Sequence, residues 1–481
     1  MASAQSQNKA TTSTSRPPLG IEIEALAHEQ RHALTQLVVI SEPLSADEVV
    51  TYLTLGGLEL TLDQVAELLA NGFDRDILII PTTDAVLPVY VLEPAARAAL
   101  THGLTPGQLR RLHTYAERLY RQQFLALANV LLAGPEDSLP AGATEDDVTA
   151  DLRWLVYALA HRPEAVELHR WALAKAVYWQ EHLFALGQQR QAAEITDAIC
   201  FALARNGHRD LALDLLARNA AALDGKERGV AVHNLATVLR ENQQHAAALP
   251  LYRRAAIMLW RERDFLNLAG VLSETSNVYR DRGRLLTALL LQSLSGALRS
   301  LLRDAKGKAI VNNQLSILYR SLRLYPLALR QSRAAEAYFR TAEDDVNLAK
   351  VMLTQGNLYN VIRRPRAALP RYEESLAISR RIGDAHIVAG ATSGLGRAYI
   401  QLRDFARAQA LLEEAITMRQ QHGDHAIGIE YENMGRLYEA RGERALANNW
   451  YHKALPYLEK YLPASAPVCR SSIERTAHRA H

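Results

Sequence analysis

The fold is decided by ATSGLGRAYIQLRDFARAQALLEEAITMRQQHGD, residues 391–424. Its apolar side chains recur at steps of three and four residues, as in LLEEAITM (411–418), and this spacing is typical of a helix that buries one face. A turn near Arg403 divides the stretch into two helices, and Asp424 stands where the next helix would open. The stretch therefore predicts a helical hairpin.

Three residue columns repeat this hairpin along the chain at intervals of 40 residues. They are aspartates (Asp224, Asp264, Asp304, Asp344, Asp384, Asp424), alanines (Ala248, Ala288, Ala328, Ala368, Ala408, and Ala447 one residue early) and tyrosines (Tyr279, Tyr319, Tyr359, Tyr399, and Tyr438 one residue early). Each aspartate can cap a first helix by accepting its unpaired N–H groups, worth roughly 1 kcal/mol. Each alanine lets two helix backbones approach closely, and each tyrosine can fill the gap between paired helices. The columns predict an all-α fold of repeated helix pairs.

These columns resemble the tetratricopeptide repeat. Its L-G-x-x-Y element occurs as Leu395-Gly396 with Tyr399, and again, with methionine for leucine, as Met434-Gly435 with Tyr438. The 40-residue unit is similar to the longer repeats of kinesin-light-chain-like arrays. The resemblance implies a right-handed α-solenoid in which the first helices of the pairs line a concave groove.

The chain divides into five predicted segments. Residues 1–20 are polar and are expected to form a disordered leader, and residues 21–104 form a separate small domain. Residues 105–188 are expected to be a helical linker of irregular pairs. The solenoid covers residues 189–462, with six clear units from about residue 225 and one weaker unit before them. Residues 463–481 are expected to be a flexible tail with Cys469 and His478 at the surface, because Pro463 and Pro467 end the last helix.

The segment 21–104 has the pattern of a winged helix. An apolar-periodic helix is predicted over 24–39, and capping boxes at Ser45/Glu48 and Thr61/Gln64 open two more helices. The β-prone runs 77–80 and 89–92 then predict a hairpin. A winged helix before a helical linker and repeats resembles the C-terminal half of bacterial signal-transducing NTPases (the STAND class). No G-x-x-x-x-G-K-[ST] loop occurs, so the resemblance implies a detached sensor half with a separate NTPase or effector chain, or a docking domain.

Charge separates the small domain from the rest of the chain. The net charge of the whole is +3, but residues 21–100 carry three basic and thirteen acidic side chains, a net of −10. Residues 1–20 contribute +2 (Lys9 and Arg16), so the remainder carries 3 + 10 − 2 = +11. The third helix of the winged-helix pattern, TLDQVAELLAN, has no arginine or lysine, which disfavours DNA binding by this domain. Nucleic-acid binding through the basic repeats stays an alternative.

Two rows of side chains are predicted to line the groove. One row directly follows the tyrosine column and holds Arg240, Arg280 and Arg320; the other lies three residues earlier and holds Asn277, Asn357, Arg397 and Arg436, with Asn313 in a third row. Arginines can fork onto carboxylates, and asparagines can bond an extended peptide backbone. The predicted partner is a peptide or protein, and the arginines favour an acidic one. The alternative is that these arginines pair with acids on neighbouring repeats.

One motif suggests catalysis. His28-Glu29-Gln30-Arg31-His32 matches H-E-x-x-H, in which two histidines bind zinc, and Glu42 or Glu59 could be a third ligand. The histidines lie opposite the apolar face of their helix, so we favour a solvated helix face over a zinc peptidase. We expect no enzyme activity and no cofactor. Two cysteines and no apolar span of about 18 residues predict a cytoplasmic protein. The sequence favours a scaffold or sensor, with a regulator that responds to a small peptide as the alternative.

Overall fold

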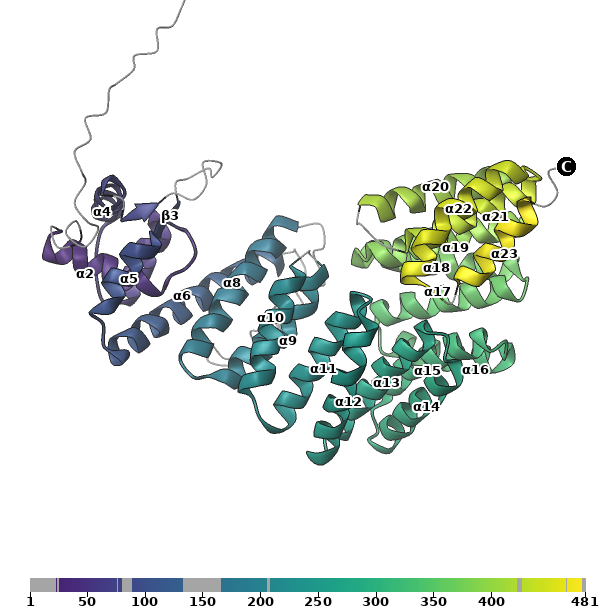
Figure 1. The fold of residues 1–481 in the computed structure, drawn as a ribbon, viewed down its shortest axis with the longest axis horizontal. Helices are drawn as coiled ribbons and strands as arrows, with labels where there is room; N and C mark the ends of the chain where they lie inside the picture. The colour runs from purple at the N-terminus through teal and green to yellow at the C-terminus, as the bar shows by residue number, and fades with distance from the viewer. Residues whose placement is uncertain are drawn as a thin grey trace, which may run out of the picture. The chain divides into compact units, whose positions relative to one another are not determined.

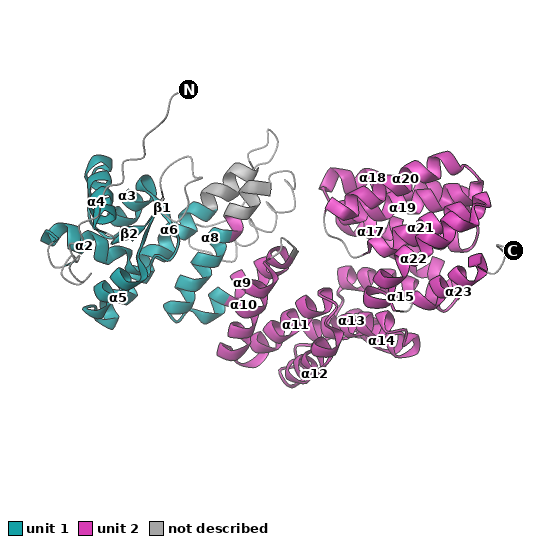
Figure 2. Ribbon diagram, turned by 45° about the horizontal axis from the view of Figure 1, so that its top comes forward, with its two compact units in different colours: residues 1–126, 174–192 teal, residues 127–173, 193–481 magenta. Residues whose placement is uncertain are grey.

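The computed structural model describes residue 23 and residues 26–75, 77–79, 89–132, 166–205, 208–421, 426–463 and 465–477. The predicted leader, the loop of the predicted hairpin, Asp424 and His478 lie outside these residues. The chain divides into two compact units, residues 1–126 with 174–192 and residues 127–173 with 193–481 (Figure 2). Each is described by itself.

The first unit begins with short helices and a small sheet. Its elements are α2 (His28–Gln36), a 3-10 turn η1 (Leu37–Val39), β1 (Leu44–Ser45), α3 (Ala46–Leu55), α4 (Leu62–Asp74), β2 (Leu78–Ile79), β3 (Val89–Leu92) and α5 (Pro94–His102). Both predicted capping boxes are present. The predicted hairpin is confirmed by the pairing of Leu78 with Leu92, and β1 adds a third strand on the other side of β3, with Leu44 opposite Tyr90. The helix predicted over 24–39 is shorter, since α2 begins at His28 and the 3-10 turn follows it.

The first unit also includes residues 106–126 of a long helix, α6 (Pro106–Leu132), and residues 174–185 of another, α8 (Val166–Ala185). The hydroxyl of buried Tyr52 on α3 donates to the carbonyl of Leu112 on α6 over 3.2 Å. Lys175 on α8 lies 2.8 Å from the carboxylate of Glu42 and 3.2 Å from that of Glu48. The described parts of the predicted linker therefore pack against the small domain.

The second unit contains consecutive helix pairs (Figure 1). A first pair, α9 (Gln189–Arg205) and α10 (Arg209–Ala222), precedes six longer hairpins: α11 (Gly225–Glu241) with α12 (His245–Arg261), α13 (Phe265–Asp281) with α14 (Leu285–Leu301), α15 (Ala305–Ser321) with α16 (Tyr325–Thr341), α17 (Asp345–Val361) with α18 (Pro365–Ile382), α19 (Ala385–Leu402) with α20 (Phe405–Gln421), and α21 (Ile427–Arg441) with α22 (Arg444–Tyr461). A closing helix, α23 (Ala466–Ala477), follows. The all-α solenoid fold is confirmed.

The aspartate and alanine columns do what their chemistry predicted. Four aspartates accept the backbone N–H three residues on and so cap α13, α15, α17 and α19; they are Asp264, Asp304, Asp344 and Asp384. Asp224 precedes α11 without such a bond. All six alanines of the column are fully buried. Close helix packing and capping therefore recur with the period of the sequence.

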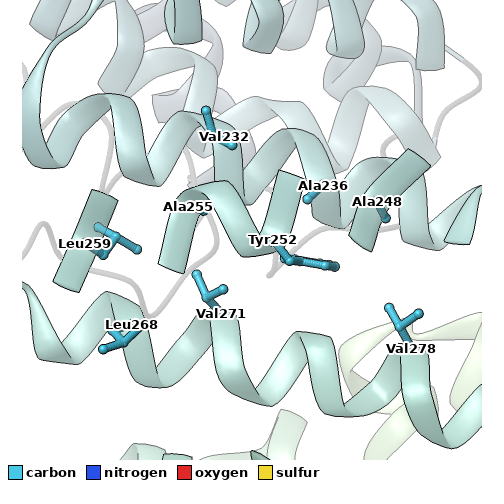
Figure 3. Close-up of a cluster of buried hydrophobic side chains, with 9 residues drawn as sticks. All are labelled: Val232, Ala236, Ala248, Tyr252, Ala255, Leu259, Leu268, Val271 and Val278. Carbon is cyan, nitrogen blue, oxygen red and sulfur yellow. The ribbon is translucent and has the colours of Figure 1, made fainter. Parts of the chain in front are cut away.

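The prediction for the tyrosine column needs correction. Its rings are only half-buried, whereas the rings that fill the hairpins come from the second helices and are fully buried: Tyr252, Tyr372 and Tyr451. Figure 3 shows Tyr252 of α12 in a cluster with Val232 and Ala236 of α11 and with Val271 of α13. A single ring thus joins three successive helices. The prediction therefore missed the fully buried rings of the second helices, whereas Tyr359, Tyr399 and Tyr438 of the predicted column pack against the cores as partly buried rings.

Glycines on the first helices accommodate these rings. A β-carbon added to Gly356 would lie 2.6 Å from Cε1 of Tyr372, and one added to Gly394 would lie 2.3 Å from the same atom. At the next-but-one hairpin, a β-carbon on Gly435 would lie 2.6 Å from Cε1 of Tyr451. Glycine is required at these positions because a ring of the second helix lies directly against the backbone.

The prediction of a flexible tail after residue 462 also needs correction. Pro467 does not end a helix; it lies in the first turn of α23, where its missing N–H costs no hydrogen bond. Ala466 and Cys469 of this helix are buried against α22, and the Cys469 thiol donates to the carbonyl of Tyr451 over 3.4 Å. Asn448 of α22 donates to the carbonyl of Ile473 over 3.0 Å. The helix covers the apolar side that the last hairpin would otherwise expose.

Candidate partner-binding face

The first helices of successive hairpins form one continuous surface. Helix α15 contacts α17, α17 contacts α19, and α19 contacts α21. We call this surface the first-helix face and define it by the two predicted rows, Arg240, Arg280, Arg320 and Asn360, and Asn277, Asn357, Arg397 and Arg436. The predicted rows therefore lie on neighbouring helices, and their side chains differ in their partners.

Two arginines of the first row are neutralised by carboxylates. The guanidinium of Arg240 lies 3.1 Å from the carboxylate of Glu274 on the neighbouring first helix. Arg280 donates to its neighbour Asp281 over 2.9 Å and to the side-chain oxygen of Asn277 over 3.0 Å. Pairing with an acid on the neighbouring repeat, the alternative from the sequence, is found for Arg240, whereas Arg280 pairs with the adjacent residue of its own helix. The row is not a uniform positive stripe.

Arg320 differs from both. Among the described residues, no side chain donates to it, accepts from it or forms an ion pair with it. Burial, together with the positive charges of Arg397 and Arg280, lowers the pKa of Arg320 to about 10. For Arg240, burial also favours a lower pKa, but Glu274, Tyr252 and Glu241 together outweigh it and leave the pKa raised. Arg320 is thus a cation at neutral pH that no carboxylate of the described residues neutralises.

Arg397 belongs to a polar network that is centred on Tyr372. It donates to the side-chain oxygen of Asn357 and, over 3.3 Å, to the hydroxyl of Tyr372. That hydroxyl donates to Asn357 over 2.9 Å and accepts from the side chain of Asn360 over 3.1 Å. No carboxylate of the described chain takes part. The network holds Asn357 and Arg397, both predicted site residues, in fixed positions.

Sequence reasoning missed Tyr372 as part of this arrangement, and it placed Asn360 in the first row without predicting its bond to Tyr372. Tyr372 follows Tyr252 by three repeats, but the equivalent positions between them hold Gln292 and Ser332, so the column is interrupted. Asn360 continues the first row in the sequence, and the structure buries it to 4% exposure. The signal in the sequence that could have identified Tyr372 is its spacing from Tyr252, which equals three repeats of 40 residues.

The other predicted residues have separate surroundings. Arg436 is exposed and pairs with Glu432, one helical turn earlier, over 2.6 Å. Asn277 is buried and donates to Glu274 over 3.3 Å. The side-chain oxygen of Asn313 is buried, and no donor of the described residues reaches it. Only the middle of the face, around α17, combines unpaired cations with polar atoms that lack partners.

The histidine motif does not form a metal site with the proposed third ligands. His28 and His32 are exposed on α2, and the buried Glu42 carboxylate is occupied by Lys175. The described residues contain no group of three or more metal-ligating side chains. Among all the described residues, no helix has both the length and the apolar character that crossing a bilayer requires.

Stacked helical hairpins with a polar first-helix face define a helical-repeat protein. Within the array, residues 347–421 match the model of the tetratricopeptide repeat family. A small domain with a three-stranded sheet precedes the array in the sequence. No curated protein matches the chain at a significant level.

Several solved structures have a similar fold. A signal transduction ATPase with numerous domains and a tetratricopeptide-repeat sensor, from Pyrococcus horikoshii, is 12% identical with a TM-score of 0.46; the match covers 94% of this chain and 66% of that one. This chain therefore spans less than two thirds of that ATPase. A Rap protein complexed with competence and sporulation factor is 13% identical (TM-score 0.48, 69% of this chain, 98% of that chain). The apo quorum sensor NprR from B. thuringiensis is also 13% identical (TM-score 0.42, 69% and 99%). Likenesses this distant concern the fold alone.

Proposed function

We propose that this chain is a recognition protein whose first-helix face binds a peptide or an exposed segment of a partner protein. The observation that carries the proposal is the contrast between the two sides of each hairpin. Alanines and tyrosines close the interior, whereas asparagines and arginines stand at equivalent positions on four successive first helices, α13 to α19. Such polar rows supply hydrogen bonds to a peptide backbone on a rigid support, which lowers the entropic cost of binding.

The pairing of the arginines favours a protein partner over a nucleic acid. A phosphate backbone is held by many cations, each of which releases counterions. On the first-helix face, Arg240, Arg280 and Arg436 already have carboxylate partners. The remaining positive charge is local and suits a single anionic group.

The first unit has a different part in the proposal. Helix α4 exposes Asp63, Gln64 and Glu67. A negative helix of this kind repels a phosphate backbone and attracts a basic protein surface. We therefore assign the first unit to docking on an effector chain, such as a separate NTPase, and the repeats to partner recognition.

The test is a footprint of the bound partner. The full chain, immobilised, captures proteins from a lysate of its own cells with and without nuclease, and backbone hydrogen exchange is then measured on the purified complex. We expect nuclease-resistant capture and slower exchange in α13, α15, α17 and α19. Protection confined to the second helices or to the first unit would contradict the proposal, and loss of capture after nuclease treatment would support nucleic-acid binding instead.

A further inference from the structure

Helix α14, the second helix of its hairpin, carries a row of leucines that the structure leaves exposed (Figure 1). The row follows steps of three and four residues along one face of the helix, with the exposed Ala297 completing the spacing. The exposed fractions are 71% for Leu286, 72% for Leu290, 51% for Leu294 and 80% for Leu301. We call the four leucines and Ala297 the α14 seam, which spans about 23 Å at the rise of an α-helix.

The repeat itself does not require these leucines. The six long hairpins share one register, so each leucine of the α14 seam has an equivalent position on the other five second helices. None of these positions holds a leucine. The Leu290 position holds Pro250, Arg330, Pro370, Ala410 and Asn449, and the Leu294 position holds Arg254, Ala334, Glu374, Glu414 and Lys453. The hairpins therefore fold without large apolar side chains there, and a contiguous exposed apolar row is typical of a surface that binds another molecule.

The neighbouring second helices make this side of the array basic. Equivalent positions of successive hairpins face the same side, so Arg254 and Arg261 of α12 and Arg330 of α16 stand on the same side as the α14 seam. All three are exposed, and no carboxylate of the described residues forms an ion pair with them. Helices α12, α14 and α16 together contain seven arginines and one acid, Glu336, which is already paired with arginines. The seam therefore has cations on both neighbouring helices.

These charges indicate what covers the seam. A second copy of the chain that docked through the same face would bring arginines against arginines, because α12 and α16 flank α14 in both copies, and like charges oppose such pairing. A partner with carboxylates beside an apolar row has no such conflict. Small side chains, Ser293, Ala297 and Ser300, stand between the leucines and leave holes that the side chains of a helix can fill.

We propose that the α14 seam is a docking site for an amphipathic helix of a partner protein. The apolar side chains of that helix pack on the seam, and aspartates or glutamates along its edges face Arg254, Arg261 and Arg330. This site goes beyond the function proposed above, because it lies on a second helix, whereas the peptide site of that function lies on first helices. The array can then hold two partners, one on each side.

The test uses two fluorescein-labelled helical peptides of three heptads with leucine at every a and d position. One has glutamate and the other lysine at every e and g position, and like charges there keep copies of either peptide apart. Binding to the full chain is measured by fluorescence polarisation. We expect the acidic peptide to bind and the basic one to bind at least about tenfold more weakly. Leu290→Gln and Leu294→Gln should each weaken binding of the acidic peptide by about 10- to 100-fold, as the loss of one buried leucine implies.

The matched control is Leu446→Gln, which replaces an exposed leucine on another second helix, α22. It should bind the acidic peptide like the unsubstituted chain. A second readout is the melting temperature, which Leu290→Gln should leave unchanged because this side chain lies in solvent in the free protein. A fall of several degrees would show a structural role for the leucine and overturn the site.

The remaining outcomes would each overturn the inference. Binding of the acidic peptide that neither α14 substitution weakens would place the peptide elsewhere, and the function proposed for the first-helix face would still stand. Dimerisation of the full chain in sedimentation velocity that Leu290→Gln abolishes would assign the seam to a second copy. Co-sedimentation with phosphatidylserine-containing vesicles that the same substitution abolishes would assign it to a membrane. Binding of neither peptide at concentrations up to about 100 μM would show that the seam does not take an acidic helix.

Discussion

Gly356 lies where a β-carbon would come 2.6 Å from Cε1 and 2.7 Å from Cδ1 of Tyr372. The ring cannot move away easily, because Gly394 also lies directly against it and the hydroxyl is bonded to Asn357 and Asn360. We expect Gly356→Ala to lower the free energy of unfolding by about 1–3 kcal/mol, as overpacking of a filled core does. Urea unfolding followed by circular dichroism measures it.

The control for this substitution is Gly270→Ala on α13. A β-carbon there would have His233 as its nearest neighbour at 3.5 Å, an ordinary contact. Alanine in a helix is favoured over glycine by up to about 1 kcal/mol, so this variant should be neutral or more stable. If both variants lost stability equally, the contact between Gly356 and Tyr372 would not be the cause.

The sequence also predicts which residue types stand on the first-helix face, but it does not predict which of the arginines pair with a carboxylate. Arg240, Arg280 and Arg320 are equivalent by register, yet Glu274 neutralises one, Asp281 the second and nothing in the described chain the third. Glu274 lies 34 residues after Arg240 in the sequence, so only the packing of one first helix on the next brings them together. That Arg320 lacks a carboxylate partner in the described chain could therefore be recognised only from the folded structure.

The turns between helices contain a second repeating feature, a residue with a left-handed backbone. After the first helices, these positions are Gln243, Gly283, Arg323, Arg363, Arg403 and Gly442, with φ between 57° and 87°. Side chains with a β-carbon are strained in this region by roughly 1–2 kcal/mol, and glycine is not. The arginines at 323, 363 and 403 are exposed. The turn geometry, rather than a side-chain contact, explains why glycine occupies two of the six positions.

A substitution pair tests this explanation. Arg323→Gly should raise the free energy of unfolding by about 0.5–1 kcal/mol, because the relief of strain exceeds the entropy that glycine adds to the unfolded chain. The same substitution seven residues on, Arg330→Gly inside α16, should lower it by about 1 kcal/mol. Thermal unfolding of the two variants gives the signs; equal signs would contradict the turn explanation.

Among the helices, the sequence predicts those features that recur in every repeat. The alanines at the helix crossings and four of the aspartate caps are confirmed because each repeat needs them alike. The buried tyrosines of the second helices were missed, because the column runs Tyr252, Gln292, Ser332, Tyr372, Leu412, Tyr451 and its members differ in polarity. What varies between repeats depends on the neighbouring small residue, which is glycine beside Tyr372 and serine (Ser273) beside Gln292.

For the repeat array as a whole, α23 is the element that closes its end. Burial raises the pKa of the Cys469 thiol to about 11 and that of the Cys200 thiol, in α9, to about 12, so neither is reactive in the folded protein. Asn448→Ala removes two hydrogen bonds from α22 to α23, at 2.9 and 3.0 Å. We expect it to speed the labelling of Cys469 by Ellman's reagent roughly five- to tenfold, as the loss of about 1 kcal/mol of local stability implies.

Cys200 is the internal control for that experiment. It lies in the first pair of the array, far along the chain from Asn448, and its labelling rate should not change. Equal acceleration of both thiols would show that the substitution promotes global unfolding, and α23 would then not open as a separate element.

The first unit should lose stability in mild acid because of two facing histidines. The Nδ1 atoms of His113 on α6 and His182 on α8 lie 2.9 Å apart. Burial, together with the neighbouring His113, lowers the pKa of His182 from 6.5 to about 3, and burial lowers that of His113. The unfolded chain therefore binds protons that the folded unit does not, and stability falls as the pH drops below about 6.5, by about 2 kcal/mol at pH 5 for His182 alone. Glu42 acts in the opposite direction at lower pH, since burial raises its pKa from 4.5.

The test of this acid sensitivity is His182→Phe, which keeps a ring beside Tyr120 but cannot take up a proton. It should reduce the difference in stability toward urea between pH 7 and pH 5, which hydrogen exchange of the α8 amides measures. His32→Phe, at an exposed position, should keep that difference; if His182→Phe kept it too, the pair would not be the source of the acid sensitivity.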